Sequence, residues 1–79
     1  MKHVFRYVDS FTGRMGGTRV ENIDAIWPCD ESSVLDDGQP LPAGTRAGIC
    51  TSESLLHSSE DHELLINRWE RQLAEVLGE

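Results

Sequence analysis

The sequence lacks long apolar runs and is poor in basic residues. No apolar segment approaches the ~20 residues that cross a bilayer, and the first residues contain no continuous apolar region of the kind found in signal peptides. The 79 residues include 7 Lys and Arg against 14 Asp and Glu, which gives a net charge of −7. These features predict a soluble, cytoplasmic protein without membrane contact.

The length predicts a single domain over residues 1–79. Its hydrophobic content of 38% and two tryptophans suffice for one small core, and the composition is not that of a disordered chain. A chain this short buries only about 60% of its unfolded surface, so its stability is marginal without a partner. Association as a homodimer is therefore a further prediction.

Cysteine is scarce, which excludes a disulfide framework. A bridge between Cys29 and Cys50 would require the fold to bring their Cα atoms within about 7 Å, and the sequence leaves this open. Structural zinc sites bring paired ligands such as C-x2–4-C. The chain contains no such cysteine pair, and the predicted start of a helix separates His57 from His62. No metal or other cofactor is expected, and a metal or redox module is the least favoured hypothesis.

Motifs for catalysis or phosphate binding are also missing. The glycines of TGRMGGT, residues 12–18, are followed by no G-K-S/T and belong to a predicted hairpin tip rather than a P-loop. Asp36-Asp37-Gly38 lacks the alternate spacing of an EF-hand. The serines near His57 form no nucleophile elbow. The sequence therefore predicts a protein that is not an enzyme.

Charge is unevenly distributed along the chain. Residues 1–19 hold four basic residues against Asp9, whereas residues 20–79 hold thirteen acids against three arginines. Phosphates would be repelled by most of this surface, so direct nucleic-acid binding is disfavoured. A basic partner is favoured instead.

The N-terminal third predicts a hairpin over residues 1–27. HVFRYVDS, residues 3–10, alternates in the manner of a strand, and the following segment is rich in turn residues. Residues 18–27 fit either a strand or a helix, because Thr18-x-x-Glu21 also resembles a capping box. We favour a strand that pairs with the first one.

The middle of the chain predicts a long acidic loop and then a strand. Residues 28–44 contain all three prolines, and Val34-Leu35 is expected to anchor this Pro/Gly-rich loop to the core. Residues 45–51 predict a short strand that buries Ile49.

The C-terminal segment predicts an amphipathic helix over residues 59–77. Ser58 or Ser59 would cap it, its apolar residues recur at helical spacing, and Gly78 would stop it. Leu55-Leu56 is expected to form a short helical turn upstream. The fold class is α+β, with a small antiparallel sheet of about three strands packed by one long C-terminal amphipathic helix.

Two acidic blocks form the predicted partner-binding surface. If the loop folds back beside the helix start, its carboxylates and those of the helix join in one negative surface that meets arginines and lysines as phosphates would. Otherwise the blocks are a solvated loop and ordinary N-terminal helix charges. Leu64, opposite the apolar stripe, suggests a contact on the same surface. The predicted residues are Asp30, Glu31, Asp36, Asp37, Glu60, Asp61, Glu63 and Leu64.

The acidic blocks DESSVLDD and SEDHE, together with the small size, give the chain the character of a known group of inhibitors. It resembles the small acidic inhibitor proteins of phages and mobile elements, including the anti-CRISPR proteins. The resemblance implies that the protein binds a nucleic-acid-handling host complex, in the host cytoplasm, and covers its DNA-binding surface. The basic N-terminal segment would confine any DNA mimicry to one face. The alternative is a structural or adaptor module that acts as a homodimer.

Overall fold

The computed structural model describes residues 4–35 and 37–78 and shows an α+β protein with two antiparallel sheets. The first sheet pairs β1 (Val4–Val8) with β2 (Met15–Arg19). A 3-10 helix, η1 (Val20–Asn22), leads into the second sheet, whose order is β3 (Ile23–Pro28), β4 (Ala47–Thr51) and β5 (Leu55–Ser58). The C-terminal helix α1 (His62–Leu77) follows β5. The predicted fold class is confirmed, and the two-stranded sheet is an addition to it.

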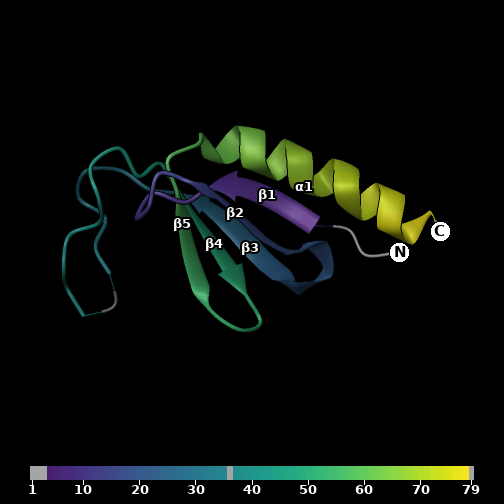
Figure 1. The fold of residues 1–79 in the computed structure, drawn as a ribbon, viewed down its shortest axis with the longest axis horizontal. Helices are drawn as coiled ribbons and strands as arrows, with labels where there is room; N and C mark the ends of the chain where they lie inside the picture. Colours follow the sequence, from purple (N-terminus) through teal and green to yellow (C-terminus); the bar gives the residue numbers. More distant parts are fainter. Residues whose placement is uncertain (1–3, 36, 79) are drawn as a thin grey trace.

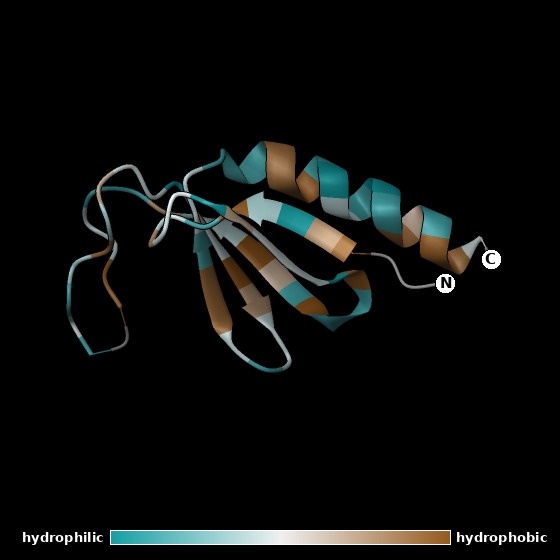
Figure 2. Cartoon of the chain, in the orientation of Figure 1, coloured by the Kyte–Doolittle hydropathy of each residue, from teal (hydrophilic) through white to brown (hydrophobic). Residues whose placement is uncertain are grey.

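Helix α1 lies along β1 (Figure 1), and it also contacts η1 and strand β3 of the three-stranded sheet. Apolar and polar residues alternate along α1 at helical spacing (Figure 2), and Leu65 is fully buried. Both sheets and the helix contribute to one core, so the burial of apolar surface joins all of them. The buried apolar residues are Phe5, Tyr7, Val20, Ile23, Ala47, Ile49 and Leu65. In the described part of the chain, no helix has the length and apolar character needed to cross a bilayer.

The hairpin is shorter than the predicted one, and its second strand is β2 rather than residues 18–27. Gly16 lies within β2 and not in the turn. Glycine is required there because a Cβ would stand 2.7 Å from the ring of Tyr7. The turn is formed upstream, where Gly13 has a φ of +73° and Asp9 accepts hydrogen bonds from Phe11 and Thr12.

Residues 18–27 are neither one strand nor one helix. Thr18 ends up in β2, so the suggested capping box does not form, and η1 separates it from β3. Strand β3 pairs with β4 and not with β1, with an irregular register between Ile23 and Ala25. The predicted strand at residues 45–51 is β4, and Ile49 in it is fully buried as expected.

The acidic loop between β3 and β4 is not anchored by Val34, contrary to the prediction. Val34 is 56% exposed and pairs with Pro40 in an isolated bridge across the loop. Leu35 is half-buried, and its N–H donates to the carbonyl of Gln39. The loop is therefore held in part by hydrogen bonds between its own residues.

The prediction of a helical turn at Leu55-Leu56 is wrong, because these residues form β5. Thr51 makes the reversal that brings β5 back onto β4: its Oγ1 donates to the carbonyl of Ser54 and accepts from the Ser54 N–H. Helix α1 also begins later than residue 59. Neither Ser58 nor Ser59 caps it; its N-cap is Asp61, and Gly78 ends it as predicted.

Candidate protein-binding surface

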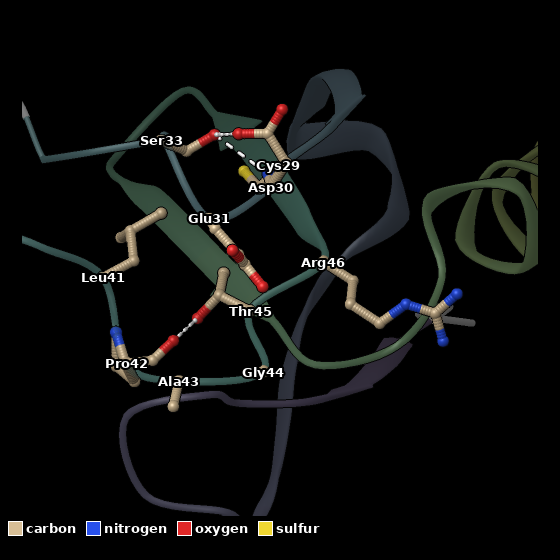
Figure 3. A pocket seen from close by; sticks show the side chains of 10 residues that line it. All are labelled: Cys29, Asp30, Glu31, Ser33, Leu41, Pro42, Ala43, Gly44, Thr45 and Arg46. Carbon is tan, nitrogen blue, oxygen red and sulfur yellow. Dashed lines mark hydrogen bonds between the residues drawn. The ribbon is translucent and has the colours of Figure 1, made fainter.

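A cleft of about 510 Å³ lies where the acidic loop joins the three-stranded sheet. The carboxylate of Glu31 points into the middle of the cleft, and the side chain of Arg46 extends away from it (Figure 3). Arg46 reaches the helix start, where its guanidinium lies 3.4 Å from the carboxylate of Asp61. The lining residues are Cys29, Asp30, Glu31, Ser33, Leu41, Pro42, Ala43, Gly44, Thr45 and Arg46.

The carboxylate of Asp30 accepts hydrogen bonds from other residues of the loop. Its Oδ1 accepts hydrogen bonds from the N–H of Ser32 at 2.9 Å and from the Ser32 hydroxyl at 2.6 Å. These bonds lower the pKa of Asp30 and hold it as an ionised acceptor in a turn. Glu31, the next residue, is exposed and forms no ion pair with another described residue.

Asp37 lies on a different part of the surface, and Asp36 falls outside the described residues. Asp37 accepts a hydrogen bond from the N–H of Gln39. It also lines a largely apolar groove of about 340 Å³ with Phe11, Leu35, Leu55 and His57. The loop therefore does not present its described carboxylates as one uniform row.

This apolar groove was not predicted from the sequence. Phe11 is 54% exposed, and its ring meets that of His57 edge-on, with 5.9 Å between centroids. The sequence signal for this groove was a phenylalanine inside a turn-rich segment. The pairing of His57 with β4 has no local signal, because the sequence predicts a helical turn at Leu55-Leu56 just before it.

The carboxylate of Glu60 is bonded to other residues of the protein and is not a free surface charge. Its carboxylate forms an ion pair with Arg68 at 3.0 Å and accepts the N–H of Val8 at 3.0 Å. The hydrogen bond from Arg68 lowers the pKa of Glu60, and the same bond raises that of the arginine. Arg68 also donates to the carbonyl of Arg6. Glu60 therefore ties α1 to β1 and is only partly accessible to a partner.

The helix start combines one neutralised and one free carboxylate. Asp61 faces both Arg46 and the imidazole Nδ1 of His62, the latter at 3.6 Å. Glu63 is exposed and forms no ion pair with another described residue. Leu64 beside it is 58% exposed, which agrees with its predicted position opposite the apolar stripe.

Arg46 lies between the base of the acidic loop and the helix start. This arginine lines the cleft together with Glu31 and forms its ion pair with Asp61 at the helix start. Because Arg46 neutralises part of the charge between them, the negative surface is narrower than the sequence suggests. Its free carboxylates in the described residues are mainly Glu31 and Glu63.

The cysteines are both free thiols. Cys29 bonds through its backbone to Arg46 at one end of the sheet, whereas Cys50 pairs with Ala25 nearer the other end. Burial raises the pKa of Cys29, so its thiol stays protonated at neutral pH. Among residues 4–35 and 37–78, no group of three or more His, Cys, Asp or Glu side chains is arranged to hold a metal ion.

No protein-family model, no curated protein and no solved structure matches the chain.

Proposed function

We propose that the protein is a non-enzymatic, acidic inhibitor that binds the basic surface of a nucleic-acid-handling complex or nuclease and blocks its DNA-binding surface. This is an anti-CRISPR-like, phage anti-defence role. The observation that carries it is the pair of exposed carboxylates, Glu31 in the cleft and Glu63 at the helix start, neither of which forms an ion pair with another described residue. Exposed carboxylates with few cations nearby meet the arginines and lysines of a phosphate-binding groove favourably.

The ionisation of the cleft supports binding rather than catalysis. Hydrogen bonds keep Asp30 charged, and burial keeps the thiol of Cys29 protonated. A general base or a nucleophile at neutral pH would need the opposite shifts. Leu64 adds an exposed apolar contact beside Glu63, and interfaces commonly combine such a contact with a polar rim.

The test is inhibition of DNA binding in a panel of purified nucleases and guide-RNA complexes, followed by fluorescence anisotropy of labelled DNA. We expect the protein to release DNA from at least one member, less effectively as the salt concentration rises. The double variant Glu31→Lys/Glu63→Lys should weaken that inhibition at least about tenfold.

The matched control is Asp24→Lys/Glu75→Lys, which changes the net charge equally. Both residues are exposed, Asp24 at the start of β3 and Glu75 in the last turns of α1. The control should inhibit as the native protein does. Equal inhibition by both double variants would refute an acidic surface centred on the cleft and the helix start.

A second candidate is a structural or adaptor module that acts as a homodimer. The outer edge of β2 favours it, because β1 is the one strand that pairs with β2 among the described residues.

A further inference from the structure

The outer edge of β1 is covered by side chains from α1. The amide of Gln72 donates to the carbonyl of Val4 at 3.0 Å, and Arg68 donates to the carbonyl of Arg6 at 2.7 Å. Val8 is held by Glu60, as described above. Uncovered strand edges are templates for pairing with another chain, and this edge is blocked against such pairing.

The outer edges of the second sheet also carry protective features. Strand β3 has an exposed Asp24 at its irregular register and ends on Pro28, which has no N–H to donate. Beside β5, the N–H of Ser10 donates to the carbonyl of His57 at 3.1 Å, so the turn after β1 covers part of that edge. Both are devices that natural proteins use against edge-to-edge association.

The outer edge of β2 has no such cover among the described residues. The bond from the Asp9 N–H to the Arg14 carbonyl fixes which residues of the hairpin face each other with hydrogen bonds. Because these pairs alternate along an antiparallel ladder, the N–H and C=O groups of Met15 and Gly17 point away from β1, as does the N–H of Arg19. The carbonyl of Arg19 accepts the first hydrogen bond of η1, because Arg19 is the N-cap of that helix. All three residues are exposed, Met15 by 58%.

We propose that β2 pairs antiparallel with β2 of a second copy, around a two-fold axis at Gly17. Gly17 is the middle residue of the strand, so its outward N–H and C=O face the same groups of the second copy. Met15 then faces Arg19 of the second copy, and the reverse. This register makes about four backbone hydrogen bonds and joins the two hairpins in one four-stranded sheet.

Charge and closure argue for a second copy rather than another strand. The register brings Arg14 at one end of β2 near Glu21 in η1 of the second copy, and neither residue forms an ion pair with another described residue of its own chain. The new sheet ends on β1 at both sides, and α1 blocks β1. The assembly therefore closes at two copies and does not grow into a fibre. It involves the basic hairpin and is independent of the acidic surface.

The test is sedimentation equilibrium of the native protein from about 1 μM to about 1 mM, the range of weak and transient complexes. The average mass should rise from one chain to two. Arg19→Pro should weaken dimerisation at least about tenfold, because it removes an outward N–H from each copy. Arg19 has a φ of −71°, which proline adopts without strain, so the hairpin itself should persist.

The matched control is Arg19→Gln, which removes the charge but keeps the N–H and should dimerise within about threefold of the native protein. Hydrogen exchange of the native protein provides a readout that needs no variant. The amides of Met15, Gly17 and Arg19 should become protected as the concentration rises. A mass of one chain throughout the range would overturn the proposal, as would protection of these amides that does not depend on concentration. Loss of the dimer in Leu64→Ser but not in Arg19→Pro would assign the interface to α1 and also overturn it.

Discussion

Replacing Glu60 with glutamine tests whether the ion pair between Glu60 and Arg68, which also bond to the backbone of β1, stabilises the fold. The side chain of Glu60 is 22% exposed and that of Arg68 is 36% exposed, so solvent screens their interaction only in part. Glutamine keeps an acceptor of similar size for Arg68 and Val8, and the substitution therefore removes mainly the charge. Hydrogen bonds to charged groups contribute about 1.5–3 kcal/mol when well shielded, and exposed ion pairs about 0.2–1 kcal/mol.

The geometry of this pair lies between those limits, so we expect Glu60→Gln to lower the free energy of unfolding at pH 7 by about 1 kcal/mol. For a domain of this size, that loss corresponds to a melting temperature lower by about 4–8 °C. Urea denaturation followed by tryptophan fluorescence measures the first quantity, and circular dichroism on heating measures the second.

The pH dependence identifies the cause. Because the bond from Arg68 lowers the pKa of Glu60 in the folded protein, the unfolded chain takes up this proton more readily. The stabilisation is fully present above the unfolded pKa of about 4.3 and is lost as the pH falls through the lower, folded value. The difference between the native protein and Glu60→Gln should therefore shrink in acid. The shift of Asp30 is common to both proteins and cancels.

The control for this experiment is Asp61→Asn. Its partner Arg46 is 60% exposed and the contact is longer, 3.4 Å, so the expected loss is below about 0.5 kcal/mol. Equal stability of native protein and Glu60→Gln at pH 7 would refute the reasoning. A difference that persists unchanged to pH 2 would also do so, since it could not then come from the charge of Glu60.

Three further predictions concern the sheet and its thiols. Gly48→Ala should lower the free energy of unfolding by about 1–3 kcal/mol and alter tryptophan fluorescence, because the new Cβ would stand 2.5 Å from the indole of Trp27. Unchanged emission would contradict this packing. Ile49→Ala should lower the free energy of unfolding, measured by urea denaturation, by about 2–5 kcal/mol, since Ile49 is fully buried. A loss below about 1 kcal/mol would place Ile49 outside the core. Mass spectrometry after alkylation without reductant should show two modified thiols, with Cys29 reacting faster as the pH rises; a disulfide-linked mass would refute two free cysteines.

Basic and acidic residues lie on different parts of the molecule, and the two proposed surfaces therefore have different roles. The exposed arginines of the hairpin, Arg6, Arg14 and Arg19, lie in the segment proposed to join two copies. The uncompensated carboxylates Glu31 and Glu63 lie on other elements. A dimer formed through β2 would present the acidic surface twice, and two linked contacts bind a repeated or extended groove more tightly than one.

Regular secondary structure with a local signal could be predicted from the sequence. The apolar residues of α1 recur at helical spacing, and β1 alternates around Phe5 and Tyr7, so neighbouring positions along the chain carry the information. The helix start was placed too early because several residues before His62 could serve as a cap. The exposed position of Leu64 followed from the same helical geometry.

The sequence by itself determined the fold class, the helix and the imbalance of charge, because each depends on composition or on residues a few positions apart. Only the tertiary structure decided which strands pair and what each carboxylate does. Glu60 bonds to Val8, 52 positions away, and Arg68 bonds to Arg6, 62 positions away. Such partners meet only after the chain has collapsed around its core. The tertiary structure therefore gives the acidic residues different roles. Some hold turns, Glu60 links α1 to β1, and others remain free charges on the surface.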